Sequence, residues 1–214
     1  MQLFHVVDLW DVVVGFFGFE SLCYAIHEDR DLVDAMFEKV GGFVASVAEA
    51  VCGFERYAGI YLADDLGHKT SLFMAPDTLR ELVLPWHRRI AEIMHAHDKL
   101  FLFHCCGNMY ALMDDYINDV KIDAKHSFED VILPVTEVKR RYGDRLTLLG
   151  GMDVDFLARR SPADIQAKGQ EILDICVPGG GYFFGSGNWV TAYVPPENYL
   201  AMLGVARAYD TQAL

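Results

Sequence analysis

Short apolar runs alternate along this chain with longer stretches of helical periodicity, and each run ends in glycine, polar or charged residues. The runs are 12–18 (VVVGFFG), 59–67 (GIYLADDLG), 100–108 (LFLFHCCGN), 122–128 (IDAKHSF), 146–153 (LTLLGGMD) and 181–188 (GYFFGSGN). Nearly continuous hydrophobicity over several residues is typical of parallel strands that are buried on both faces. The pattern therefore predicts a strand at each of these runs.

The stretches between the runs have the marks of helices. Apolar residues recur at three- and four-residue spacings in 29–51, and Pro76-Asp77 opens a second helix in which Pro85 predicts a kink. The segment 161–164 (SPAD) supplies an N-cap hydroxyl, a first-turn proline and an acid at the third position, and 195–197 (PPE) opens a last helix. Helices thus follow strands throughout the sequence.

This alternation predicts an α/β fold, either an open doubly wound sheet or a closed barrel. No G-x-G-x-x-G follows an early strand, which disfavours a dinucleotide-binding sheet. Polar and metal-capable residues instead gather at strand ends, where barrel enzymes carry their sites. The pattern favours a TIM-type (β/α)8 barrel or part of one, built from about six strand–helix units. Without a linker or internal repeat, we expect a single domain over residues 1–214.

Composition narrows the class of protein. The 214 residues include 31 acidic and 18 basic side chains, a net charge of −13, which disfavours a nucleic-acid partner. No apolar run is long enough to span a membrane, and the N-terminus lacks the layout of a signal peptide. Five cysteines in such a chain indicate free thiols. We expect a soluble, cytoplasmic protein.

The strongest chemical signal is His104-Cys105-Cys106-Gly107 at the end of the third run. Side chains alternate faces along a strand, so His104 and Cys106 should point the same way and Cys105 the other. An imidazole and a thiolate that converge in this way form half of a tetrahedral zinc site. The alternative is a buried cysteine pair with a packing role, because free cysteine often acts as a small hydrophobe.

Carboxylates follow the second run as the adjacent pair Asp64-Asp65. Two charges at the mouth of a core strand are costly unless a metal, cation or substrate lies opposite them. One of the pair could instead serve as an N-cap or a solvated loop residue. Glu20, His126, Glu129 and Asp153 end other runs, and their recurrence at strand ends supports a common site.

The last run ends in Gly185-Ser186-Gly187-Asn188, which could present backbone N–H groups to an anion. His87, His95 and His97 lie on or near the second predicted helix. The last two fall on different helical faces, so they are not expected to share a metal site, and all three are expected at the surface.

Taken together, these segments resemble the uroporphyrinogen decarboxylase superfamily, which includes zinc-dependent methyltransferases that move methyl groups between corrinoid proteins and thiols. The segments are VVVGFFGFE, YLADDLGHKTSLFMAPD, LFLFHCCGN, AKHSFED, LTLLGGMDVDFL and PGGGYFFGSGNWV with VPPENYLAM. The resemblance implies a (β/α)8 barrel with its site at the C-terminal mouth. The chain resembles the third through eighth units, so the first two units are expected to be missing.

The resemblance fits the methyltransferase branch better than the decarboxylase. The decarboxylase ends its last strand in Gly-His-Gly, where this chain has Gly187-Asn188-Trp189, and its substrate loop and catalytic Asp have no counterpart here. In the methyltransferases the H-x-C-G motif supplies two zinc ligands, matched by His104 and Cys106. Their third ligand, a cysteine, is replaced by Asn188. Asparagine is a poor zinc ligand, so either the metal affinity falls or another residue takes the third position; the candidates are His126, Asp65 and Cys105, in that order.

This resemblance, together with the residues at the strand ends, implies a zinc enzyme that moves a methyl group between a corrinoid protein and a thiol or similar acceptor. Its predicted residues divide into metal ligands (His104, Cys106, His126), catalytic carboxylates (Asp64, Asp65, Glu20) and substrate-binding residues (Asn108, Glu129, Asp153, Ser186, Asn188). One rival function is a metal-free, porphyrinogen-type decarboxylase. A second is a non-catalytic half-barrel that needs a partner chain.

An incomplete barrel would also expose strand edges. We expect unpaired edges at 12–18 and 181–188, with Phe16 and Phe183 facing water, unless the stretch 1–10 folds back over the gap. Such edges predict a homo-oligomer or a complex with a complementary chain.

Overall fold

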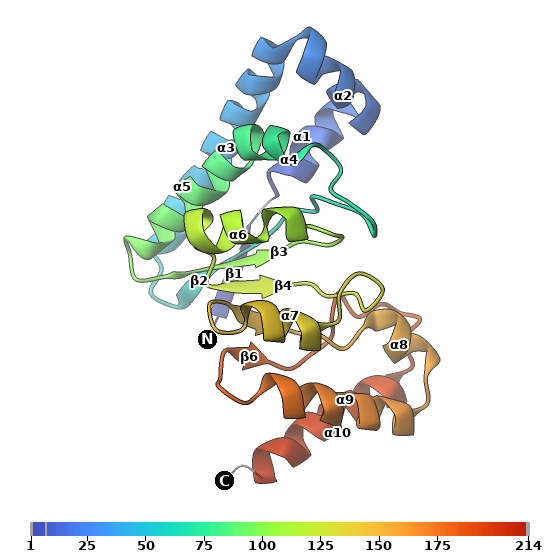
Figure 1. The fold of residues 1–214 in the computed structure, drawn as a ribbon. Coiled ribbons are helices and arrows are strands. Elements are labelled where there is room, and N and C mark those ends of the chain that lie inside the picture. The colour runs from blue at the N-terminus through green and yellow to red at the C-terminus, as the bar shows by residue number, and fades with distance from the viewer. Residues whose placement is uncertain (1, 7, 213–214) are drawn as a thin grey trace. The chain divides into compact units, whose positions relative to one another are not determined.

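The computed structural model describes residues 2–6 and 8–212, which form two compact units, 1–123 and 124–214. Figure 1 shows the helices and strands of both units. Each unit carries parallel strands joined by helices, as the alternating pattern predicted. The α/β fold class is confirmed, and the prediction of a single domain stays a prediction.

The first unit is built on three parallel strands. They are β1 (Gln2–Val6), β2 (Tyr57–Ala63) and β3 (Leu100–His104), and β2 pairs with both of the others. Its helical segments are α1 (Trp10–Phe17), α2 (Phe19–Glu28), α3 (Arg30–Cys52), α4 (Pro76–Leu82), α5 (Leu84–His95), η1 (Tyr110–Leu112), α6 (Met113–Asp115) and the π-helical η2 (Tyr116–Val120).

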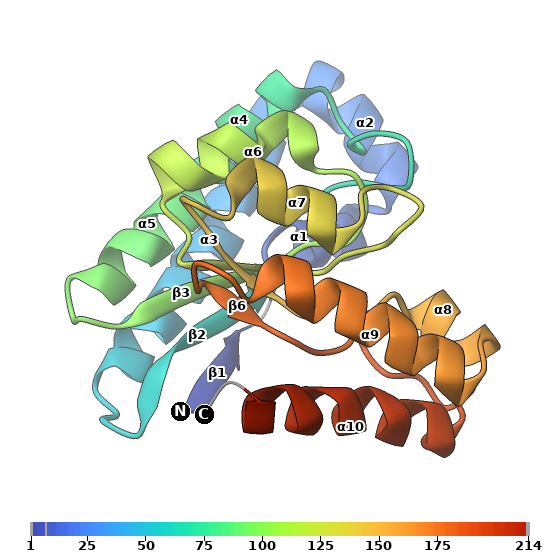
Figure 2. The ribbon, with the colours of Figure 1, turned by 60° about the horizontal axis from the view of Figure 1, so that its bottom comes forward.

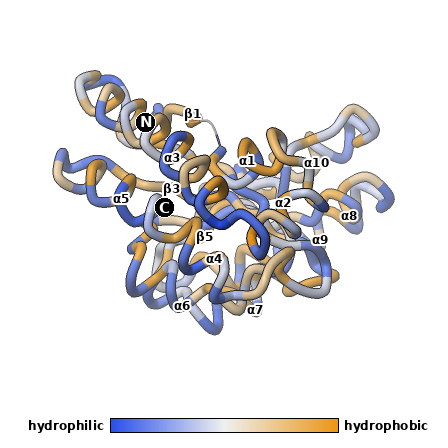
Figure 3. The backbone as a smooth tube through the Cα atoms, turned by 90° about the horizontal axis from the view of Figure 1, so that it is seen from above, coloured by the Kyte–Doolittle hydropathy of each residue, from blue (hydrophilic) through white to orange (hydrophobic). Residues whose placement is uncertain are grey.

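The long helices α3 and α5 lie side by side in this unit (Figures 1 and 2) and contact the strands. Hydrophobic and hydrophilic residues follow one another along both helices (Figure 3). In α3 the buried residues, among them Val33, Phe37, Val40 and Val44, form the apolar stripe that was predicted for 29–51. A Cβ at Gly41 would lie 2.1 Å from the Trp86 ring, so the two helices approach closely only because this residue is glycine. Asp29 caps α3 by accepting a hydrogen bond from the N–H of Leu32.

The second unit has short strands and longer helices. Its strands are β4 (Ala124–His126), β5 (Thr147–Leu149) and β6 (Tyr182–Phe183), and its helices are α7 (Val135–Tyr142), α8 (Val154–Arg159), α9 (Pro162–Cys176) and α10 (Pro196–Gln212). Figure 2 shows α9 and α10 packed side by side. The capping box that 161–164 predicted is present, with Ser161 and Asp164 each accepting a hydrogen bond from the other's backbone N–H.

The strand predicted at 12–18 is wrong, because this run lies in α1 and the following turn. Its apolar residues are compatible with a strand or a helix, and a carboxylate distant in the sequence stabilises the helix. Asp64 accepts hydrogen bonds from the N–H groups of Trp10 and Asp11, which are otherwise unpaired at the start of a helix. Trp10 and Val13, one turn apart, are buried.

The first strand is instead β1, which the sequence pattern did not predict as a strand. It lies within the stretch 1–10 that was expected, as an alternative, to fold back. The kink predicted at Pro85 is also corrected: α4 ends at Leu82, and Pro85 lies in the first turn of the separate helix α5, where it needs no hydrogen-bond partner for its nitrogen.

Candidate metal centre

Three potential metal ligands meet at the ends of β2 and β3. The Nε2 of His104 lies 3.2 Å from the Sγ of Cys106 and 4.0 Å from the Oδ1 of Asp65. One ligand atom from each residue lies within 4.8 Å of the others. His104 and Cys106 therefore share a side, as strand alternation predicted.

Cys105 faces the other way. It is fully buried, and its Sγ accepts a hydrogen bond from the N–H of Leu66 and donates one to the carbonyl of Cys106. This placement separates the two adjacent thiols, one directed into the protein and one toward the candidate site. Of the three candidates for the third ligand, Asp65 is the one whose carboxylate the structure brings to His104 and Cys106.

Two loops fix the position of Cys106. Gly107 has φ +76°, and a Cβ there would lie 2.1 Å from the carbonyl oxygen of Gly67, so only glycine allows the loops after β2 and β3 to touch. Asn108 continues the contact, because its backbone N–H donates to the carbonyl of His68. Its side chain also serves the loops: Nδ2 donates to the Thr70 carbonyl and Oδ1 accepts from the backbone N–H of Tyr110.

Tyr61 orients the imidazole of His104. Its hydroxyl is hydrogen-bonded to Nδ1 of His104 at 2.8 Å, which leaves Nε2 directed toward Cys106. Burial raises the pKa of Tyr61, so the phenol stays neutral. A partner on the far ring nitrogen is the usual way in which a ligating histidine is held. The sequence analysis missed Tyr61, although it lies two residues before the strand position opposite His104.

The two adjacent aspartates have different surroundings. Asp64 is fully buried and accepts hydrogen bonds from the start of α1 and from Nε2 of His87 at 2.9 Å. The side chain of Asp65 is 42% exposed and accepts from the N–H of Cys106. The contacts with α1 and His87 thus make Asp64 the buried member of the pair, and Asp65 is left available to a ligand.

Asp8 and Asp11 add further carboxylates beside this pair. Burial and the charges of neighbouring aspartates raise the pKa of Asp8 to about 7 and that of Asp11 to about 6. Asp8 follows β1, so it obeys the same strand-end rule that pointed to Asp64 and Asp65. It was missed because β1 itself was not predicted.

His87 is fully buried, and the expectation that it lies at the surface is wrong. The signal was present in the sequence: Leu84, His87, Ile90, Ala91 and Met94 form the buried stripe of α5. His95 lies on the same helix, is partly exposed, and pairs with Asp123 at 2.9 Å.

Glu20 does not lie at a strand end. It is exposed in the first turn of α2, because the run before it is helical. Its predicted catalytic role rested on that strand end and loses its basis.

The remaining predicted residues belong to the second unit, where strand ends also meet. Nε2 of His126 is hydrogen-bonded to the carbonyl of Ser186 at 3.1 Å, and burial lowers the pKa of His126 to about 4. The Ser186 hydroxyl donates to the carbonyl of Asn188, whose Oδ1 accepts from the N–H of Trp189. Glu129 is half-buried in the loop after β4.

Asp153 is committed to the backbone. Its Oδ1 accepts from the N–H groups of Asp155 and Phe156 at the start of α8, and its Oδ2 accepts from the N–H of Asp130. Asp153 therefore acts as the N-cap of α8 through Oδ1. Both carboxylate oxygens of this predicted substrate-binding residue already accept hydrogen bonds from the backbone.

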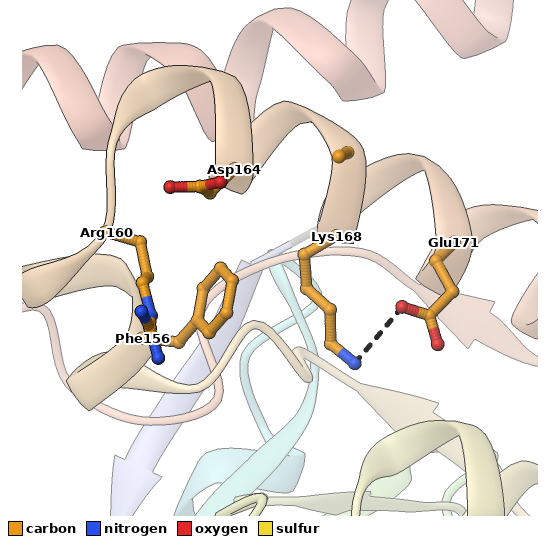
Figure 4. Close-up of a pocket in the computed structure, with 6 residues that line it drawn as sticks. Phe156, Arg160, Asp164, Lys168 and Glu171 are labelled. Carbon is orange, nitrogen blue, oxygen red and sulfur yellow. Dashed lines mark hydrogen bonds and ion pairs between the residues drawn. The ribbon is translucent and has the colours of Figure 1, made fainter.

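A pocket of about 370 Å³ also lies in the second unit (Figure 4). Lys168 pairs with Glu171 at 3.3 Å, and the guanidinium of Arg160 lies over the Phe156 ring. Asp164 belongs to the capping box of α9, so the charged groups of this pocket have partners within the fold.

No helix in 2–6 or 8–212 combines the length and hydrophobicity that a membrane crossing requires.

Comparison with known proteins gives one family. The family model described as "Uroporphyrinogen decarboxylase (URO-D)" matches residues 10–209. The methylated-thiol–coenzyme M methyltransferase of Methanosarcina mazei is 26% identical over 185 residues, which cover 86% of this chain and 47% of that protein. The uroporphyrinogen decarboxylase of Nitrosomonas europaea is 33% identical over 83 residues, 39% of this chain and 23% of that protein. The chain spans at most about half the length of these relatives.

Solved structures agree on the fold. A methyltransferase from Methanosarcina mazei aligns with a TM-score of 0.78 at 19% identity, over 96% of this chain and 58% of that one. A putative vitamin-B12-independent methionine synthase from Listeria monocytogenes aligns with a TM-score of 0.51 at 17% identity, over 81% and 55%. With the family model covering most of its length, the chain belongs to the uroporphyrinogen decarboxylase (URO-D) family.

Proposed function

We propose that this chain binds zinc through Asp65, His104 and Cys106 and takes part in methyl transfer to a thiol. The observation that carries the proposal is the convergence of a carboxylate, an imidazole and a thiol whose ligand atoms lie within 4.8 Å of one another. These are the three ligand types that zinc takes in proteins.

The distances fit such an ion. Zinc bonds of about 2.0 to 2.3 Å place tetrahedral ligand atoms roughly 3.3 to 3.8 Å apart. The separations of 3.2 Å and 4.0 Å measured from His104 Nε2 lie close to this range. Three protein ligands leave a fourth position for substrate, the arrangement typical of catalytic zinc.

The chain's own residues prepare this centre. Nδ1 of His104 is hydrogen-bonded to the Tyr61 hydroxyl, and a metal-binding His104 would carry its proton on Nδ1 and present the lone pair of Nε2. Asp65 keeps one carboxylate oxygen on the N–H of Cys106 and has lone pairs left for a metal. Zinc, when bound, lowers the pKa of a coordinated substrate thiol and so supplies a thiolate at neutral pH.

The choice of reaction rests on the relatives. A relative that matches 86% of this chain is named a methylated-thiol–coenzyme M methyltransferase. By the resemblance drawn from the sequence, a separate corrinoid protein would exchange the methyl group with the thiol. Metal analysis of protein purified without a His-tag should find close to one zinc per chain. A chain that neither retains nor takes up zinc contradicts the proposal.

A porphyrinogen decarboxylase is the rival within the same family. Its substrate carries several carboxylates, which call for a cluster of uncommitted cations. The basic pairs that the sequence offers are exposed and engaged: Arg140 and Arg141 with Glu137, and Arg159 with Asp155. We expect no conversion of uroporphyrinogen to coproporphyrinogen in an anaerobic assay, and clear turnover would favour the rival.

A further inference from the structure

A chain of buried polar side chains runs behind the candidate metal centre. Asp64, His87 and Tyr116 are all fully buried. Nε2 of His87 lies 2.9 Å from Oδ2 of Asp64, and its Nδ1 lies 2.9 Å from the Tyr116 hydroxyl. Both ring nitrogens of His87 are therefore hydrogen-bonded, although none of these three side chains faces solvent.

The proton positions on His87 follow from its two partners, Asp64 and Tyr116. Asp64 also accepts the N–H groups of Trp10 and Asp11, which requires an acceptor, so the His87 proton lies on Nε2. Burial raises the pKa of Tyr116 well above its ordinary value, so its hydroxyl keeps its proton and donates it to Nδ1. The tyrosine thereby fixes the imidazole tautomer that faces Asp64.

Asp64 connects His87 and Tyr116 to the candidate metal centre. Its backbone N–H donates to the carbonyl of His104 at 2.9 Å, and its side chain holds the start of α1. The next residue, Asp65, donates its N–H to Asp11 on that helix and accepts the N–H of Cys106. The orientation of Asp64 thus fixes the backbone that presents Asp65.

We propose that His87 is a positioning residue of the metal centre, which acts through Asp64 to hold Asp65 beside His104 and Cys106. The inference rests on the proposed zinc function and adds a residue to it that touches no metal or substrate. Removal of a partner that bonds a metal ligand directly typically changes metal affinity by about 10- to 100-fold, and we expect His87, which acts through Asp64, to lie at the low end of that range.

The test is a titration with Co²⁺ as a spectroscopic substitute for zinc, on the full chain, at a temperature where circular dichroism shows each variant folded. His87→Phe keeps a ring but loses both hydrogen bonds, and should weaken Co²⁺ binding by about 10-fold. His87→Gln keeps a donor and should retain most of the affinity. His95→Gln, on the exposed part of the same helix, is the matched control and should bind as the wild type does.

Tyr116→Phe provides a milder variant if His87→Phe does not fold. Its ring stays stacked on Phe103, where the centroids are 4.5 Å apart, and only the hydroxyl is lost. We expect a smaller loss of affinity in the same direction, because the tautomer of His87 is no longer fixed.

A double-mutant cycle with Asp65→Ala separates positioning from general damage. If His87 acts through Asp65, His87→Phe should cost little further affinity once Asp65 is removed. An equal loss in both backgrounds, or no loss in the wild-type background, overturns the inference while the zinc site stands. A wild-type chain that binds neither Co²⁺ nor zinc overturns the proposed function together with it.

Discussion

The backbone N–H of Cys106 donates a hydrogen bond to Oδ1 of Asp65 across 2.7 Å. This contact joins the residues that follow two neighbouring parallel strands, β2 and β3. It holds the carboxylate beside the thiol without using the thiol itself. The adjacent Asp64 and Cys105 are buried in the protein. In both the aspartate pair and the cysteine pair, the first residue therefore supports the fold and the second lies at the candidate site.

The two cysteines should therefore differ in metal binding. Cys106→Ser removes a soft ligand and should weaken zinc binding by more than about 100-fold, since this exceeds the usual loss of an outer-shell partner. Cys105→Ser is the matched control and should change affinity far less, because its sulfur faces the Leu66 backbone. Competition with a zinc chelator measures both. Equal losses in the two variants contradict this assignment.

The two aspartates should differ in stability. Asp64→Asn weakens the acceptor of three N–H groups in the core and should lower the free energy of unfolding by about 2 to 4 kcal/mol. Asp65→Asn, at an exposed side chain, should leave stability within about 0.5 kcal/mol and reduce zinc affinity instead. Urea denaturation of the metal-free protein gives the first quantity and metal titration the second. The reverse ranking would show that Asp64, not Asp65, serves the site.

Asp8 should make stability fall as pH rises. Its pKa is raised from 3.8 to about 7 in the folded chain, so between these values the folded state holds a proton that the unfolded state has lost. The free energy of unfolding therefore decreases with increasing pH in this window. Asp8→Asn should make that decrease shallower, as measured by urea denaturation at a series of pH values with a chelator present.

The comparison must be made between variant and wild type, because His126 acts in the opposite direction. Its pKa is lowered from 6.5 to about 4, so its contribution to stability is lost as pH falls through that range. Identical pH profiles for Asp8→Asn and the wild type would contradict the predicted role of Asp8.

Self-association is expected from exposed aromatic side chains. Phe16 is 70% and Phe183 is 60% exposed, in line with the exposure predicted for them, although Phe16 lies on α1 and not on an edge strand. Burying such rings contributes a few kcal/mol, at about 25 cal/mol per Å². Light scattering at micromolar concentration should show a dimer or larger species, and Phe16→Ser should shift it toward monomer. A compact wild-type monomer would refute this expectation and the need for a partner chain.

Sequence patterns identified five of the six predicted strand positions and the starts of four helices, α3, α4, α9 and α10. The run 100–103 (LFLF) is apolar throughout, which is typical of a strand covered on both faces, and the capping residues of 161–164 act locally. The first run, VVVGFFG, is short and apolar, so its residues do not distinguish a strand from a buried helix. Because the first strand was predicted at this run, Glu20 was wrongly assigned to a strand end. Asp8, which follows the true first strand, was missed.

The sequence by itself determined the facing of His104, Cys105 and Cys106, because side-chain alternation along a strand depends only on local backbone geometry. It also brought Asp64 and Asp65 to the same strand end. Only the tertiary structure decided that Asp65 faces the thiol while Asp64 holds α1 and His87, since these contacts join residues up to 54 positions apart. Hydrogen bonds over such separations depend on how strands and helices pack, and no local pattern records them.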